Sequence, residues 1–440
     1  EWIVGRGWHQ EKWDRAPSGA VEGFPTHDSV SAVSPDNPVM LVHASGHATF
    51  FNQRAMALAG VGRGTANPPG GEILRDATGA ATGVFREHAA GLVARVHTAS
   101  TLRRSPAARR AALRRSILLA DRECMRHGVT SFQDAGSSVA EVELLRAMVE
   151  AGEIRTRLYV MVRDSNAKLA ANLARLRTVD RPDQRFTVRA IKRSIDGALG
   201  SRGAWLLEDY SDQPGSRGLA TATTESLRET AELAIRHGYQ LCVHAIGDRA
   251  NRETLNLFER VFTRHPGVDR RWRIEHAQHL HPDDIPRFAA LGVIASMQGI
   301  HCTSDAPYVL ARLGRERALK GAYVWRSLLR SGARVTNGTD APVESVDPLA
   351  SFYATVSRRL ADGSVFFPDQ CLTRMEALRS YTADGAFAAF EEGSKGTLAP
   401  GRVADMVVLS KDILRCAESQ IPQARVDITV VGGVVRYQRE

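Results

Sequence analysis

The chain has 440 residues and a formal net charge of +9 at pH 7, with 43% hydrophobic and 24% charged residues, a balance typical of soluble globular proteins. No stretch approaches the roughly 18 consecutive apolar residues that a membrane-spanning helix needs, so no membrane partner is expected. The length exceeds one ordinary hydrophobic core, and we expect two or three domains unless a barrel takes up most of the chain.

The positive charge does not indicate a nucleic-acid partner. The arginines are spread through helical patterns, and their one local cluster, residues 103–115, recurs at helical spacing around Ala and Leu, which favours a solvated helix face. The five cysteines form no CxxC pair, so neither a disulfide framework nor a structural zinc module follows, and a reducing cytoplasm fits best. We therefore expect a cytoplasmic protein with a small-molecule substrate, and self-association stays open.

The first hundred residues lack a regular alternation of strands and helices. Residues 38–43 are typical of a strand and residues 52–58 of the start of a helix, while residues 67–71 mark a turn-rich passage. The chain begins at Glu1 with no initiator methionine, and we expect its true N-terminal segment to lie upstream.

From about residue 106 the pattern changes to strands that alternate with amphipathic helices. Helices are predicted over residues 107–127, 139–151, 224–237, 250–264, 282–291 and 374–390. Strands are predicted over residues 130–134, 157–162, 188–192, 240–244, 271–276, 293–297 and 333–337. This alternation indicates an α/β protein with a parallel sheet, one strand short of a (β/α)8 TIM-type barrel. Near the C-terminus, short strands and Gly turns over residues 396–409, 426–431 and 432–435 indicate a small all-β element.

Lys192 is unusual for its place and its type. The chain contains six lysines against 52 arginines, yet a lysine stands in the strand predicted over residues 188–192, before the Gly-punctuated loop at 196–203. Lysine, unlike arginine, can lose its proton when buried and then act as a nucleophile or a ligand. A lysine at a strand end that extends to water would leave the same pattern.

Four side chains that could bind a metal stand at the C-terminal ends of predicted strands, namely Lys192, His244, His276 and Asp340. In a barrel these ends converge on one mouth, where catalytic groups lie. Taken singly, each histidine is more often a core or loop residue. Four potential ligands in one register, however, favour a site for a divalent metal such as zinc, with one or two ions bound. A neutral Lys192 could be carboxylated and bridge two metals. Asp340 would take a proton from metal-activated water and pass it to a leaving nitrogen.

Several motifs together resemble the amidohydrolase superfamily, and within it the YtcJ-like branch, amidohydrolase family 3, whose characterised member type is the N-substituted formamide deformylase. The segments that carry the resemblance are residues 188–203, His244-Ala-Ile-Gly-Asp248, Glu275-His-Ala-Gln278, Asn337-Gly-Thr-Asp-Ala-Pro342 and Gly401-Arg-Val-Ala-Asp405, with residues 5–8 and 45–48 resembling a segment that this branch inserts between its first and second barrel strands.

The resemblance implies a metal-dependent barrel with a companion β-sandwich that hydrolyses non-peptide C–N bonds. It implies an inserted segment at residues 1–100, barrel strands 2–8 within 101–392 and the C-terminal half of the sandwich at 393–440. Lys192 would be the carboxylated ligand, and His244, His276 and Asp340 the other ligands, with Asp340 also the general base. The residues expected near the substrate are His301, His47 and Arg202.

One feature departs from that family. Its pair of histidines separated by a single residue on the first strand is absent here: His279 and His281 lie in a Pro-bounded loop, and His43 and His47 are four apart. We expect that strand upstream of Glu1, and poor binding of one metal without it. Two alternatives to amide hydrolysis stay open from the residues, namely hydrolysis of an ester, lactone or cyclic ureide, and an inert fragment or pseudoenzyme that acts as a binding protein.

Overall fold

The computed structural model describes residues 1–179 and 184–440, and these residues form two compact units. Unit 1 consists of Glu1–Ala112, Ile195–Ala222 and Pro307–Glu316. Unit 2 consists of Leu113–Ser194, Thr223–Ala306 and Arg317–Glu440, and therefore carries the alternating strands and helices that the sequence predicts.

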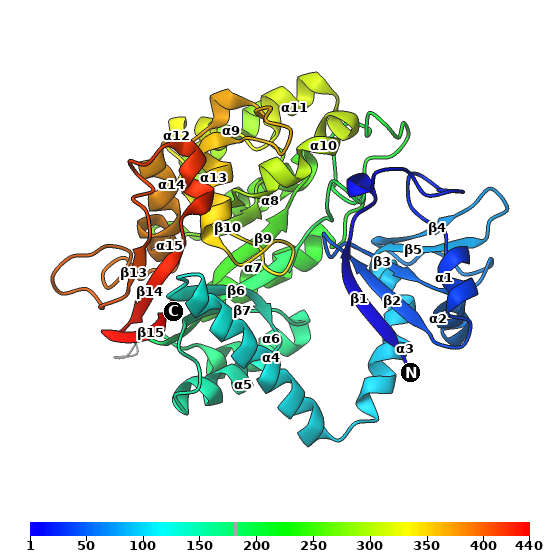
Figure 1. The fold of residues 1–440 in the computed structure, drawn as a ribbon, viewed down its shortest axis with the longest axis horizontal. Coiled ribbons are helices and arrows are strands. Elements are labelled where there is room, and N and C mark those ends of the chain that lie inside the picture. Colours follow the sequence, from blue (N-terminus) through cyan, green and yellow to red (C-terminus); the bar gives the residue numbers. More distant parts are fainter. Residues whose placement is uncertain (180–183) are drawn as a thin grey trace. The chain divides into compact units, whose positions relative to one another are not determined.

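The core of unit 2 is a curled sheet in which all neighbouring strands are parallel (Figure 1). Within the described residues the sheet has seven strands in the order β12-β11-β10-β9-β8-β7-β6. The strands are β6 (Ser131–Ser137), β7 (Arg157–Val162), β8 (Phe186–Ser194), β9 (Gln240–Ala245), β10 (Arg273–His276), β11 (Ile294–Gln298) and β12 (Val335–Gly338). Each corresponds to one predicted strand, which confirms the α/β class and the parallel, barrel-type sheet.

Alternate residues of neighbouring strands face the interior of this sheet, because side chains along a strand point to opposite faces in turn. Tyr159 and Met161 of β7, Ala190 of β8 and Cys242 of β9 pack into one buried cluster, joined by Ala389. The register pairs Met161 with Ala190. The next interior position of β8 is Lys192, which pairs with Cys242.

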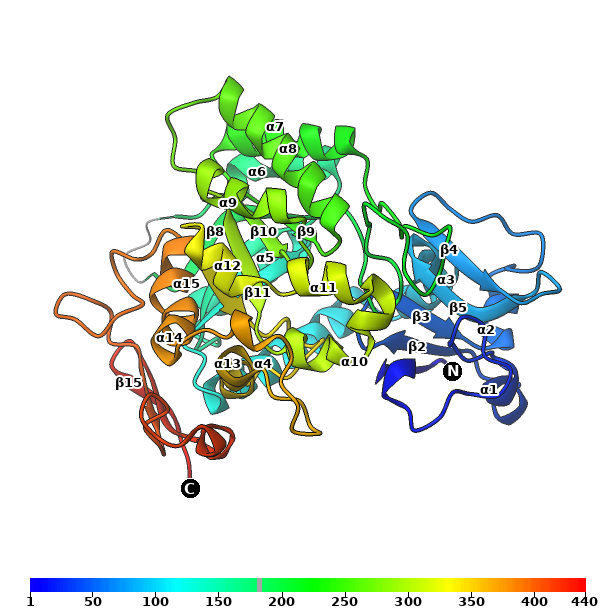
Figure 2. The ribbon, with the colours of Figure 1, turned by 90° about the horizontal axis from the view of Figure 1, so that it is seen from above.

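Helices separate the strands of unit 2 along the chain (Figure 2). They are α4 (Pro106–Arg126), α5 (Val139–Glu150), α6 (Asn166–Leu176), α7 (Thr224–His237), α8 (Asp248–Arg264), α9 (Ile285–Leu291), α10 (His301–Leu313), α11 (Arg315–Gly321), α12 (Trp325–Arg330), α13 (Pro348–Ser357), α14 (Arg374–Tyr381) and α15 (Ala383–Ala388), of which α4, α10 and α11 cross the boundary between the units. The single helix predicted over 374–390 is wrong, since the non-helical backbone of Thr382 (φ −117°, ψ −88°) divides it into α14 and α15.

Unit 1 contains a mixed sheet that the sequence analysis did not predict beyond one strand. In the described residues its order is β1-β2-β3-β5-β4, with parallel pairing only between β1 and β2. The strands are β1 (Ile3–Trp8), β2 (Val39–His43), β3 (Ala48–Phe51), β4 (Gly71–Arg75) and β5 (Ala81–Glu87), accompanied by α1 (Asp28–Val33), α2 (Gln53–Leu58) and α3 (Gly91–Leu102). The expectation of an irregular segment was wrong. The alternation of apolar and polar residues that indicates a strand is interrupted by glycines such as Gly7 and Gly83 (both φ 99°). It is also absent from β3, which is buried along its whole length.

The predicted all-β element at the C-terminus is an antiparallel sheet of β13 (Met406–Leu409), β14 (Val426–Val431) and β15 (Val434–Gln438). Its outer strands expose apolar side chains, among them Val408 and Val435. Among the described residues, no helix combines the length and the apolar character that a membrane crossing requires.

Candidate metal centre

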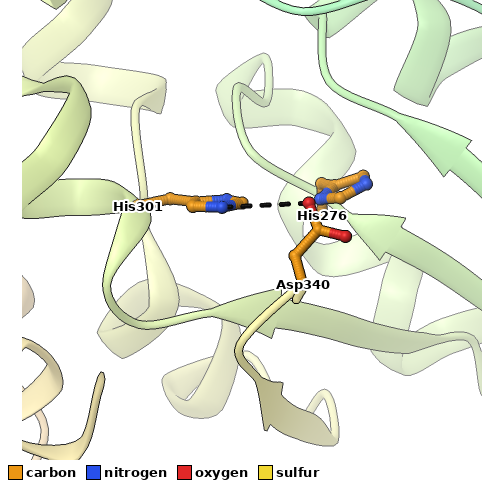
Figure 3. A group of neighbouring side chains, drawn as sticks. All are labelled: His276, His301 and Asp340. Atoms are coloured by element: carbon orange, nitrogen blue, oxygen red, sulfur yellow. Dashed lines mark ion pairs between the residues drawn. The ribbon is translucent and has the colours of Figure 1, made fainter. Parts of the chain in front are cut away.

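Three potential metal donors meet at the C-terminal ends of the parallel strands. His276 ends β10, His301 begins α10 shortly after β11, and Asp340 follows β12. One ligand atom from each lies within 4.8 Å of the other two. Figure 3 shows His301 and Asp340 pointing toward one another, with 3.9 Å between His301 Nε2 and Asp340 Oδ2, and His276 beside them. Segments far apart in the sequence thus bring two imidazoles and a carboxylate to one place.

The backbone turns two of these side chains into the group. His276 and Asp340 have φ values of 75° and 55°, in the left-handed region that residues other than Gly rarely adopt. On β10 the interior positions are Arg273 and Glu275, so a regular continuation of the strand would direct His276 away from the interior. Each residue held in a sparsely populated backbone conformation lowers the stability of the fold by roughly 1–3 kcal/mol, and such residues are concentrated at functional sites.

His276 is held in one tautomer by a neighbouring strand. Its Nδ1 lies 2.6 Å from Oε1 of Gln298, the last residue of β11, and because an amide oxygen only accepts, Nδ1 carries the proton. Burial lowers the pKa of His276 to about 4, so the ring is neutral at pH 7. The Nε2 atom is then left with its lone pair, which is the arrangement that a metal-binding imidazole needs.

His301 has a buried nitrogen without a hydrogen bond. Its Nε2 has no hydrogen-bond partner in the part of the chain that the structure describes, although the side chain is only 9% exposed. A buried polar atom left unpaired costs free energy unless something binds it. The Asp340 carboxylate lies 3.9 Å from this nitrogen, so the two donors fit a cation held between them. The residues present therefore fit a divalent ion.

The predicted ligands Lys192 and His244 lie beside this group but outside the set of three. The His244 and His276 rings contact edge to face with their centroids 4.5 Å apart. Lys192 is buried, and its Nζ donates to the carbonyl of Arg193 at 3.3 Å. Burial lowers the pKa of Lys192 to about 8, while the negative charges of Glu275 and Asp340 oppose that shift. The roles of Lys192 and His244 as metal ligands stay predictions.

The two other residues predicted to contact the substrate belong to unit 1. His47 Nδ1 lies 2.9 Å from Oε2 of the buried Glu87. Arg202 donates to Asp212 at 3.0 Å and to the carbonyl of Glu22 at 2.9 Å, bonds that fix the loop in which it stands. His301, also predicted to contact the substrate, lies among the three potential donors, and its contact with substrate stays a prediction.

A buried charge pair lies inside the sheet on the strand that carries His276. Arg273 Nε is 3.3 Å from Glu275 Oε1 and also donates to Cys242 Sγ at 3.3 Å, while another nitrogen of the same guanidinium donates to Gln133. Sequence reasoning did not identify this pair or Gln298. The signal was present in both cases, since polar residues in strands of a buried parallel sheet require partners.

A model of the family described as "Amidohydrolase family" matches residues 1–437. Protein LONG AFTER FAR-RED 3 of Arabidopsis thaliana is 33% identical over 99% of this chain and 74% of its own length. The putative amidohydrolase YtcJ of Bacillus subtilis is 30% identical, with 100% and 80% covered, and the N-substituted formamide deformylase of Arthrobacter pascens is 31% identical, with 94% and 76% covered. The crystal structure of an uncharacterized metal-dependent hydrolase from Pyrococcus horikoshii matches with a TM-score of 0.72 and 26% identity, over 95% of this chain and 78% of that one.

Proposed function

The chain belongs to the amidohydrolase family, a family of hydrolases, and from this premise we propose that it is a metal-dependent enzyme that cleaves a non-peptide C–N bond in a small amide or formamide-like molecule. The observation that carries the proposal is the meeting of His276, His301 and Asp340, with a buried His301 nitrogen that has no hydrogen bond within the described residues. The similarity to a formamide deformylase supports the type of bond.

We propose zinc as the ion, because two imidazoles and a carboxylate are ligands that it prefers. His276, His301 and Asp340 would hold it, with His244 and a carboxylated Lys192 completing the ligands for one or two ions. The chemistry that such an ion supplies is polarisation of a carbonyl group and a lowered pKa of water.

The residues of the chain have separate tasks in this proposal. An Asp340 oxygen would accept the proton of the attacking water and return it to the leaving nitrogen, as a general base and then a general acid. Gln298 fixes the proton of His276 on Nδ1, and burial keeps that ring neutral, so that its Nε2 stays available.

The test is hydrolysis of a panel of N-formyl and N-acyl amines by the full chain supplied with zinc, with bound metal measured on the same samples. Asp340→Asn is expected to lower kcat by roughly 10²–10⁴-fold, the usual share of a general acid and base. Asp283→Asn, an exposed carboxylate of the same unit, is the matched control and should leave kcat unchanged. Protein that binds no metal and cleaves no member of the panel would contradict the proposal, as would an Asp340→Asn variant with full activity. Hydrolysis of esters or lactones alone would contradict the type of bond.

A further inference from the structure

Arg163 stands level with Lys192 on the interior face of the parallel sheet. It directly follows β7, and its backbone N–H donates to the carbonyl of Ser137 at 2.8 Å. The register pairs Val162 with Ile191, so the next residues along the two strands are Arg163 and Lys192. Met161 is two residues before Arg163 and lies in the interior cluster, and alternate residues share a face. Arg163 therefore faces the side on which the predicted metal ligands stand.

A glycine makes room for the Arg163 side chain. A Cβ atom on Gly136 of β6 would lie 2.8 Å from Arg163 Cδ and 3.5 Å from Lys192 Cγ. The φ of 137° at Gly136 also disfavours any other residue there. The stems of Arg163 and Lys192 thus share one space over this glycine, which puts a permanent positive charge beside the predicted ligand.

The charge of Arg163 is not compensated within the described residues. Its side chain makes one long hydrogen bond, from Nη2 to Ser194 Oγ at 3.4 Å, and no carboxylate lies within ion-pair distance. The neighbouring Asp164 pairs with Lys168 instead, at 3.1 Å. Arg193, on the next strand, donates to Thr230, Asn166 and the Asp164 carbonyl. Because a guanidinium carries five N–H donors, Arg163 keeps most of its binding capacity, and it is exposed.

We propose that Arg163 binds a carboxylate of the substrate, so that the enzyme acts on amides that carry this group. A guanidinium and a carboxylate match through two parallel hydrogen bonds, which one arginine can supply alone. The inference rests on the proposed function for the reaction, but the binding of a carboxylate can be measured without any turnover.

The kinetic experiment uses two substrates that differ only in the carboxylate, N-formylphenylalanine and N-formylphenethylamine. The wild-type chain should prefer the first, and Arg163→Met should lower kcat/KM for it by about tenfold to a hundredfold, the usual effect of a charged hydrogen bond, with little change for the second. Arg163→Lys keeps the charge but not the planar guanidinium, and its kcat/KM for N-formylphenylalanine should lie between those of the wild type and Arg163→Met. The control is Arg175→Met, which removes an exposed arginine of α6 that pairs with Glu143.

A binding experiment separates this inference from the proposed reaction. Calorimetry with phenylacetate should show binding to the wild-type chain and to Arg175→Met, and binding weaker by at least tenfold to Arg163→Met. Turnover of both substrates with the same preference in wild type and Arg163→Met, or phenylacetate binding unaffected by that change, overturns the inference and leaves the reaction standing. Phenylacetate binding that depends on Arg163 in a chain without turnover supports the inference while the proposed reaction fails. Binding of inorganic phosphate but not of phenylacetate overturns the choice of a carboxylate.

Discussion

Removal of Arg273 alone should destabilise the protein far more than removal of its whole buried pair. Arg273 and Glu275 are 2% and 6% exposed, and in the part of the chain that the structure describes Glu275 Oε1 accepts no hydrogen bond. Arg273→Met would therefore leave a buried carboxylate whose main compensating charge is gone. Breaking such a pair costs about 3–5 kcal/mol. In metal-free protein, where Lys192 is an unmodified amine, its positive charge also interacts with Glu275, so for that form we expect the lower end, about 3 kcal/mol.

The double variant Arg273→Met, Glu275→Leu should recover most of that loss. Both charges are then replaced by apolar side chains of similar size, an exchange that is often neutral or stabilising. The free energies of unfolding follow from urea titrations monitored by circular dichroism, with equal m-values as the condition for comparing them. Arg228→Met serves as the control, since its pair with Glu225 is exposed on both sides and its loss should change the free energy of unfolding little. A single variant that loses less than about 1 kcal/mol, or a double variant no more stable than the single one, would refute the reasoning.

Two further predictions concern the histidines. Gln298→Leu removes the acceptor that fixes the His276 tautomer and should weaken zinc binding by about 10–100-fold, measured by competition with a chelator, while Gln370→Leu should not. Burial lowers the pKa of His279 from 6.5 to about 3, so at pH 5 the unfolded chain binds a proton that the folded chain does not. The resulting loss of about 2 kcal/mol in unfolding free energy from pH 7 to pH 5 should be absent in His279→Phe. A variant with the same pH dependence of unfolding free energy as the wild type would count against this assignment.

The sequence predicted the parallel sheet because helix and strand periodicities are distinct there, and strand ends led directly to Lys192, His244, His276 and Asp340. It did not predict His301 as a donor, since that residue stands beyond its strand, and only the start of α10 brings it to Asp340. The sheet of unit 1 was missed because its strands are short and interrupted by glycines. Side-chain partnerships such as Gln298 with His276 depend on the register between strands, which one sequence does not reveal.

The left-handed backbone at His276 and Asp340 limits what redesign can achieve at these positions. A different donor placed there, for example Cys or Glu, would inherit a conformation that suits Asn and Gly far better than most residues. Attempts to retune metal preference by exchanging single side chains would thus lose stability before they gained selectivity. Libraries that vary the preceding loop residues together with the donor, so that the main chain can relax, have the better chance of success.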